Sequence, residues 1–209
     1  MLRFPLLTLR STSFLIPFLL IAFNCHAEGI LVFGDSLSAG YGIDTQSAWP
    51  KLLEDKLRTE GYRYTVHNAS ISGETTAGGR TRLDEALQRT QPQILILELG
   101  ANDGLRGLPL SAMRANLEAM IASAQKSRAK VLLLGMRMPP SMGQDYTEKF
   151  RTTFEDVAKA NKTALLPFFL EGVAGRRELI QSDGLHPVAA AQKLLLDNVW
   201  PQLKPLLKK

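Results

Sequence analysis

Apolar runs of strand length alternate with segments of helical periodicity along most of this chain. Five segments are predicted as strands, at residues 29–33, 62–68, 93–99, 130–135 and 163–167. Within two of them, residues 94–97 and 131–134 are continuously apolar, which is typical of parallel strands covered on both faces. The alternation of strand and helix therefore predicts an α/β fold, a three-layer α/β/α sandwich around a five-stranded parallel sheet.

Four segments between and after these strands place apolar residues on one helical face. The four stripes are Trp49, Leu52, Leu53 and Leu57; Met113, Leu117, Met120, Ile121 and Ala124; Tyr146, Phe150, Phe154 and Val157; and Val188, Ala191, Leu195 and Val199. We expect these stripes to pack against the sheet, and none of them requires a ligand.

The first 27 residues have the pattern of a secretory signal peptide. Arg3 and Arg10 precede the apolar run 14–23, and the small side chain of Ala27 stands directly before Glu28. The pattern predicts cleavage after Ala27, export to the periplasm or the medium, and one domain over residues 28–209.

Two kinds of membrane attachment are the alternatives to cleavage. A spanning helix needs about 20 apolar residues, roughly twice the length of this run, and Pro17 lies inside it. A lipid anchor on Cys25 would need a small residue before it, where the chain has Asn24. We therefore expect no stable membrane anchor, and loss of Cys25 leaves a mature chain without cysteine.

The charge of the chain gives little support to nucleic-acid binding. The formal net charge is +5, and removal of Arg3 and Arg10 lowers it to about +3. The pair Arg176-Arg177 is read as solvated surface, and no recognition-helix or zinc-finger signature is present. We expect a monomer whose partners are small molecules.

Three residues have the types and positions of a hydrolytic triad. Ser36 follows the first predicted strand, and Asp183 and His186 lie three positions apart near the end of the chain. A serine hydroxyl needs a neighbouring base, and an imidazole oriented by a carboxylate supplies one. His67 is not expected to be the base, because no aspartate lies nearby in the sequence to orient it. The alternative for Asp183 is an N-cap of a helix that starts near Pro187.

Motifs that could carry chemistry converge on one edge of the predicted sheet. Gly34-Asp-Ser36, residues 68–73 and Gly100-Ala-Asn102 follow the first, second and third strands. In open parallel sheets, ligands bind outside the carboxyl ends of the strands. We therefore expect the site to lie at this edge.

These blocks resemble those of the SGNH hydrolases, also called GDSL esterases and lipases, over essentially the whole mature chain. The matching blocks are Gly34-Asp-Ser-Leu, Gly73 in Ser72-Gly-Glu-Thr, Gly100-Ala-Asn102-Asp and Asp183-Gly-Leu-His186-Pro. Within the family the chain is similar to periplasmic bacterial enzymes described as thioesterase, arylesterase and lysophospholipase. The resemblance implies a flavodoxin-like fold and hydrolysis of acyl esters and thioesters.

The resemblance also implies a role for each site residue. Ser36 would be the nucleophile, His186 the general base and Asp183 its partner. The backbone N–H groups of Ser36 and Gly73 and the side-chain amide of Asn102 would form the oxyanion hole.

Two aspartates flank these groups. We expect Asp35 and Asp103 to be structural, as acceptors for loop N–H groups, and leave both outside the site.

No cofactor is expected, because the sequence has neither metal-ligand spacing nor a phosphate-binding glycine pattern. The loops after strands three and four are apolar: Leu105, Leu108, Pro109, Leu110, Met136, Met138, Pro139, Pro140 and Met142. They fit either an acyl-binding groove or ordinary packing at the edge of the core. The alternatives to an acyl hydrolase are a carbohydrate O-deacetylase and a noncatalytic lipid-binding carrier.

Overall fold

The computed structural model describes Met1 and residues 28–209, and it contains the predicted five-stranded sheet. The strands are β1 (Glu28–Gly34), β2 (Tyr64–Asn68), β3 (Ile94–Glu98), β4 (Lys130–Leu134) and β5 (Ala164–Leu166). All are parallel, in the order β2-β1-β3-β4-β5. The predicted signal peptide lies outside the described residues.

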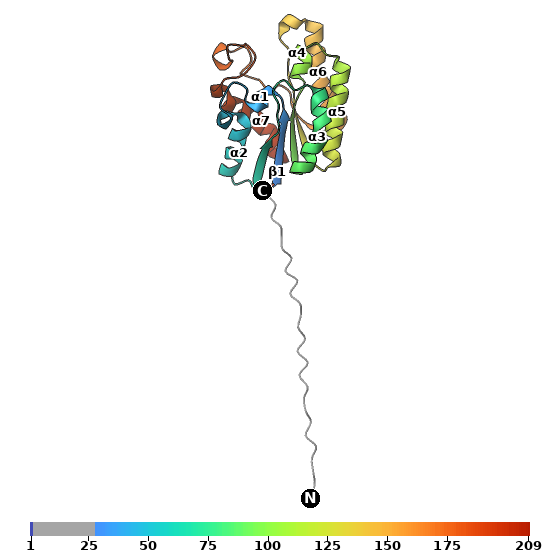
Figure 1. Ribbon diagram of the computed structural model, residues 1–209, viewed down its shortest axis with the longest axis vertical. Coiled ribbons are helices and arrows are strands. Elements are labelled where there is room, and N and C mark those ends of the chain that lie inside the picture. Colours follow the sequence, from blue (N-terminus) through green and yellow to red (C-terminus); the bar gives the residue numbers. More distant parts are fainter. Residues whose placement is uncertain (2–27) are drawn as a thin grey trace.

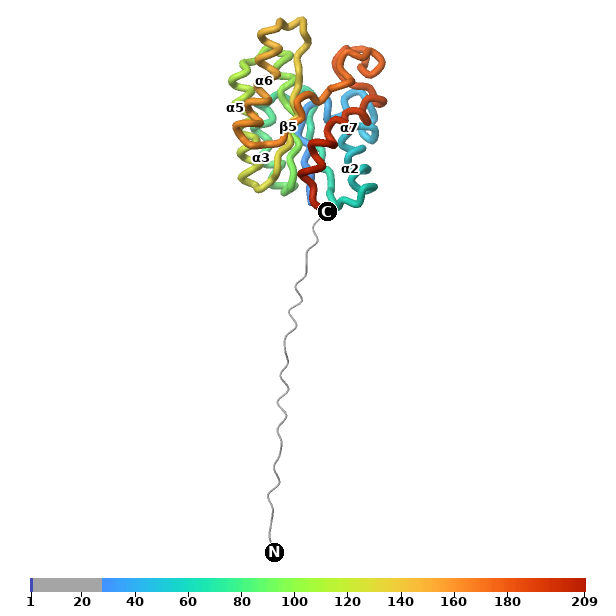
Figure 2. The backbone as a smooth tube through the Cα atoms, turned by 180° about the vertical axis from the view of Figure 1, so that it is seen from behind, coloured from blue at the N-terminus to red at the C-terminus, as the bar shows by residue number. Residues whose placement is uncertain are grey.

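Helices cover both faces of the sheet, which confirms the three-layer sandwich. They are α1 (Ser36–Ala39), α2 (Trp49–Thr59), α3 (Thr76–Thr90), α4 (Ala101–Leu105), α5 (Leu110–Lys126), α6 (Gln144–Asn161) and α7 (Gln192–Leu203). Short 3-10 segments lie at Thr45–Ser47, Pro140–Met142, Arg177–Leu179, Ala189–Ala191 and Lys204–Leu206. Helices α2 and α7 cover one face, and α3, α5 and α6 the other, as the opposite views in Figures 1 and 2 show. Over the part of the chain described, no helix is long and apolar enough to cross a membrane.

Helix α3 was not among the predicted helices. Its buried residues are Thr76, Gly79, Leu83, Ala86 and Leu87, so glycine and threonine occupy positions where an apolar stripe would be read. At Gly79 helix α3 packs closely against the core, since an added Cβ would lie 2.4 Å from Leu99 Cδ1 and 3.3 Å from Phe33 Cε1, and these side chains would have to shift. The side chain of Thr75 starts the helix by accepting from Gly78 N at 3.3 Å.

The central strands β1 and β3 form the middle of the core. Their inner residues are completely buried, including Ile30–Phe33 and Ile94–Leu97, as expected for a sheet covered on both faces. Helices α1 and α4 begin directly after these strands, and Figure 1 shows both at the upper end of the sheet, far from the C-terminus. The carboxyl ends of β1 and β3 therefore bring two of the sequence motifs together.

Candidate active site

Ser36 lies where β1 turns sharply into α1. Asp35 is the N-cap of this short helix, and its Oδ1 accepts from Leu37 N at 3.0 Å. Ser36 is the first helical residue, so its N–H has no acceptor within the helix. Its hydroxyl points to the chain's C-terminal part, where Ser36 Oγ and His186 Nε2 are 2.8 Å apart. The turn thus presents both a hydroxyl and a backbone donor at the sheet edge.

Asp183 makes two kinds of contact with one carboxylate. Its Oδ2 lies 2.6 Å from His186 Nδ1, and its Oδ1 accepts from Leu185 N at 2.9 Å and His186 N at 3.0 Å. The helix-cap alternative is wrong, because the next helical segment begins only at Ala189, after an extended Val188 without a side-chain cap bond. The carboxylate therefore closes its own loop and orients the imidazole.

The loop that carries the imidazole is held by a residue that sequence reasoning did not single out. Gln181 N donates to His186 O at 2.7 Å, and Gln181 Nε2 donates to Tyr41 O at 2.8 Å and Pro187 O at 3.1 Å. The rings of Tyr41 and His186 have centroids 4.5 Å apart. No motif signals Gln181, because its partners are backbone carbonyl oxygens, two of them in its own loop and one in the distant segment at Tyr41.

The hydrogen bonds around Asp183 predict its titration. Donation from His186 N, then from Leu185 N and the imidazole, lowers the pKa of Asp183 from 3.8 to about 2. Because this folded-state pKa is depressed, the stabilisation is present above about pH 3.8 and is lost as pH falls through about 2. We expect NMR of the side-chain carbon to show no titration of Asp183 near pH 3.8. A midpoint at the ordinary aspartate value would contradict this geometry.

Asn102 and Gly73 follow two other strands, β3 and β2. Asn102 lies in α4 after β3, and its Nδ2 donates to Asp35 Oδ2 at 3.0 Å. Gly73 lies in the turn after β2 with a φ of 79°, a conformation that favours glycine, and its carbonyl accepts from Arg106 Nη2 at 2.9 Å. Ser36 and Asn102 line the same pocket, whereas Gly73 lies outside its lining.

Both flanking aspartates accept from backbone N–H groups, as expected, but the donors lie at the starts of helices and not in loops. Asp103 accepts from Thr76 N at 2.8 Å and Thr76 Oγ1 at 2.5 Å, which ties α4 to the start of α3. Asp35 accepts from Leu37 N in the first turn of α1 and, in addition, from the side-chain amide of Asn102. The second contact links Asp35 to the candidate oxyanion hole, which sequence reasoning did not foresee.

A cavity of about 580 Å³ opens beside Ser36 and His186. Its apolar lining includes Leu105, Met136, Met138, Pro139, Pro140, Phe168, Leu170, Ile180 and Leu185. Of the apolar loop residues singled out in the sequence, five line this cavity. The other four do not: Leu108, Pro109, Leu110 and Met142. The pocket is a mainly apolar space whose polar lining consists of Asp35, Ser36, Asn102, Arg137 and His186.

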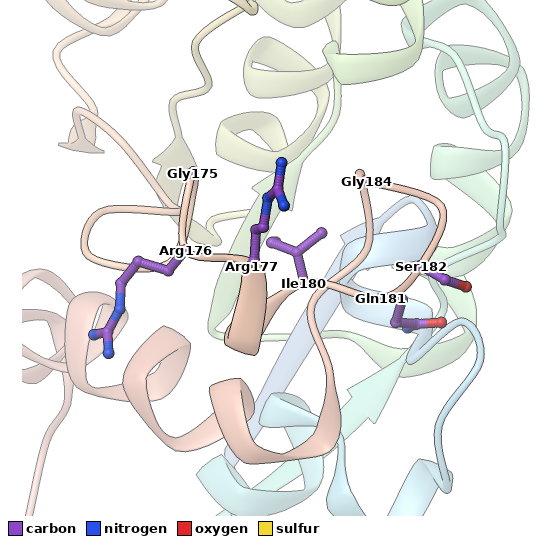
Figure 3. A pocket seen from close by; sticks show the side chains of 7 residues that line it. All are labelled: Gly175, Arg176, Arg177, Ile180, Gln181, Ser182 and Gly184. Carbon is purple, nitrogen blue, oxygen red and sulfur yellow. The ribbon is translucent and has the colours of Figure 1, made fainter.

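A second hollow of about 360 Å³ adjoins this pocket through Gly175, Ile180 and Gly184. Its other lining residues include Arg176 and Arg177, whose side chains point in different directions in Figure 3. Its lining is more polar and lacks the methionine and phenylalanine side chains of the first. Arg176 pairs with Glu178 at 2.8 Å.

Neither histidine of the described chain belongs to a metal cluster. Over Met1 and residues 28–209, no three His, Cys, Asp or Glu side chains are grouped so that they could hold an ion. His67 is exposed near the end of the edge strand β2. The hydrogen-bonded row of Ser36, His186 and Asp183 at the edge of a parallel sheet is the arrangement that serine hydrolases use.

Comparison with known proteins identifies the family. The model of the GDSL-like lipase/acylhydrolase family matches residues 32–194, and the chain belongs to this family of ester hydrolases. It is 50% identical over 188 residues to esterase TesA of Pseudomonas aeruginosa, covering 90% of this chain and 94% of the relative. It is 39% identical over 196 residues to thioesterase 1/protease 1/lysophospholipase L1 of Escherichia coli K12, covering 92% and 93%.

Solved structures agree with this assignment. A crystal structure of TesA is 51% identical, with a TM-score of 0.85 over 86% of this chain and 100% of that chain. The psychrotrophic esterase EstA from Pseudoalteromonas sp., described as inhibited by monoethylphosphonate, is 39% identical, with a TM-score of 0.82 over 85% and 97%. The SGNH resemblance and its fold are therefore confirmed.

Proposed function

We propose that this protein is an exported serine acyl hydrolase of broad specificity, which cleaves fatty-acyl thioesters and carboxylic esters through an acyl-Ser36 intermediate. One observation carries the proposal. Ser36 Oγ is 2.8 Å from His186 Nε2, and the other ring nitrogen is 2.6 Å from Asp183 Oδ2, at the mouth of an apolar pocket.

The geometry suits a two-step acyl transfer. Ser36 Oγ attacks the acyl carbon as its proton passes to His186 Nε2, and Asp183 stabilises the resulting imidazolium. The carbonyl oxygen becomes an oxyanion that accepts from Ser36 N, Gly73 N and Asn102 Nδ2. The bond to the leaving sulfur or oxygen then breaks as the imidazolium donates its proton to it. Water attacks the acyl-serine by the same path, with His186 again as the base, and releases the carboxylic acid.

The larger pocket suits the acyl chain. Met136, Met138, Phe168 and Leu170 present apolar surface beside Ser36, and methionine side chains adapt to chains of different length. The adjoining hollow with Arg176 and Arg177 has a more polar lining and suits an acyl chain less well. This lining favours the acyl-groove interpretation over simple packing at the edge of the core.

The names of relatives support the substrate classes. The relative from Escherichia coli is named thioesterase and lysophospholipase, and one from Vibrio mimicus, 40% identical over 195 residues, is named arylesterase. We propose aryl esters, acyl thioesters and lysophospholipids as substrates here. No cofactor is needed, since each proton in the scheme moves between Ser36, His186, water and the leaving group.

We further propose that residues 1–27 are a signal peptide removed on export to the periplasm, and that residues 28–209 are a monomeric single domain. The support is that β1 begins at Glu28, directly after the proposed cleavage site. Cleavage after Ala27 would therefore leave every strand and helix of the sandwich intact.

The substrate class is tested with p-nitrophenyl esters from acetyl to palmitoyl, using residues 28–209. We expect turnover that depends on Ser36 and rises from acetyl to medium chains, because longer chains bury more apolar surface in the pocket, at about 0.8 kcal/mol per methylene. Ser36→Ala is the blank. Activity confined to the acetyl ester would contradict the proposal and indicate a deacetylase. No activity on any ester, with ligand still bound by Ser36→Ala, would indicate a carrier.

A further inference from the structure

Glu98 is a completely buried carboxyl beneath the candidate site. It ends β3, a strand whose five residues are all buried, and its exposed fraction is 0%. Strands β1 and β3 pair with Gly34 opposite Glu98, so the side chain lies beside the next residue, Asp35. A buried carboxylate is costly unless it is paired, and the ion pairs found among the described residues do not include Glu98.

The carboxyls of Asp35 and Glu98 differ in how many of their oxygens accept hydrogen bonds. Asp35 accepts on both oxygens, from Leu37 N and from Asn102 Nδ2, each at 3.0 Å. Glu98 Oε2 accepts from Ser38 Oγ at 2.8 Å and from Asp35 N at 3.3 Å, but Glu98 Oε1 has no donor partner within the described residues. The two carboxyls lie next to each other, because Asp35 N donates to Glu98 Oε2 and Glu98 is opposite Gly34 in the register of β1 and β3. Two adjacent buried carboxylates repel each other, and a proton on the unpaired oxygen of Glu98 would remove that repulsion.

Electrostatics agrees with this assignment. Burial, followed by the neighbouring Asp35 charge, raises the pKa of Glu98 well above its usual value. Burial also raises the pKa of Asp35, to about 6, against the opposing effects of the Leu37 N–H, the Asn102 amide and the more distant His186. The pair therefore holds one proton and one negative charge at neutral pH, with the proton on Glu98 and the charge on Asp35.

We propose that Glu98 is a neutral carboxylic acid that positions Asp35 and, through it, the Asn102 amide for oxyanion binding. One amide hydrogen of Asn102 donates to Asp35, which fixes the plane of the amide and leaves the other hydrogen for the substrate. Glu98 is thus a positioning residue that touches neither substrate nor Ser36 Oγ. The inference rests on the proposed serine mechanism.

The glycine of the nucleophile motif has a role in this arrangement. A Cβ on Gly34 would lie 2.6 Å from Glu98 Oε2 and 2.9 Å from Glu98 O. On the other side, Ser38 receives a hydrogen bond from Trp49 Nε1 at 3.3 Å while it donates to Glu98. The buried network therefore runs from α2 through Glu98 and Asp35 to α4, and Gly34 makes the room for it.

Two substitutions separate positioning from mere packing. In Glu98→Gln the amide can donate to Asp35 and its oxygen can accept from Ser38, whereas Glu98→Leu keeps similar bulk without hydrogen bonds. We expect Glu98→Leu to lower kcat about 10- to 100-fold with little change in KM, since a misplaced group loses transition-state contacts. We expect Glu98→Gln to restore kcat to within roughly threefold of the wild type. Glu118→Gln, on the surface of α5 in a pair with Arg114, is the matched control.

Infrared spectroscopy tests the proton without using activity. At neutral pH we expect the wild type to show the C=O stretch of a protonated carboxylic acid, and Glu98→Gln to lack it. Absence of this band from the wild type would overturn the proposal, even if Glu98→Leu failed to fold. A folded Glu98→Gln as slow as Glu98→Leu would also overturn it, and so would wild-type kcat in Glu98→Leu. Failure of the serine mechanism itself would appear separately, as turnover that persists in Ser36→Ala.

Discussion

Ser36→Ala and His186→Ala should each lower kcat by about four to six orders of magnitude, and the double variant should be no slower than either single variant. The reason is that the hydroxyl and the imidazole act as one unit, joined by the 2.8 Å contact between Oγ and Nε2. Removing either group leaves only substrate binding and the oxyanion hole. Steady-state rates on a p-nitrophenyl ester, with active-site concentration matched, measure the effect.

The matched control is His67→Ala, which removes the other histidine of the described chain. His67 is exposed on the edge strand β2, so this variant should keep wild-type turnover. Circular dichroism should show all variants folded, because both Ser36 and His186 lie at the rim of the pocket and not in the core. Full turnover in His186→Ala would contradict the triad. So would a double variant whose loss of kcat equals the product of the losses in the two single variants.

Asn102→Ala should lower kcat by about 10²- to 10³-fold and leave KM nearly unchanged. The amide is half-buried beside Ser36 and is already held by Asp35 at 3.0 Å, so its free hydrogen has a fixed direction. A donor that meets charge only in the transition state changes kcat and not ground-state binding. Full Michaelis curves for one ester separate the two parameters.

The control for this prediction is Asn161→Ala, at the end of α6 before β5 begins. Its Nδ2 bonds to Val157 O within the same helix, at the opposite edge of the sheet from the pocket, so turnover should be unaffected. If Asn102→Ala raised KM at constant kcat, Asn102 would be a substrate-binding residue. It would then not serve as an oxyanion donor.

The sheet could be predicted because its strands differ in pattern from everything around them. The runs 94–97 and 131–134 are apolar on both faces, and the structure places them in β3 and β4. Helix α3 could not be predicted in the same way. Its close approach to the sheet is made by Gly79, and a residue that lacks a side chain contributes no apolar signal.

The proposed site was predictable where its chemistry is local in the sequence. Asp183 and His186 are three residues apart, and scarcity of histidine leaves few candidates for the base. Glu98 was hidden because it ends an apolar strand, and its partner Asp35 is 63 residues away. Only the parallel register of β1 and β3, which sets Gly34 opposite Glu98, reveals the contact. Gln181 could not be predicted because its partners are all backbone oxygens, which leave no pattern in the sequence, and one of them, Tyr41 O, is 140 residues away.

The central claim is that the acyl group passes through Ser36. The most direct measurement is to quench turnover of a p-nitrophenyl ester with acid, digest the protein and locate the acyl group by mass spectrometry. We expect the added acyl mass on the peptide that contains Ser36, and its absence from His186→Ala treated in the same way. An acyl group on another residue of the wild type, or ester turnover that survives in Ser36→Ala, would contradict the account.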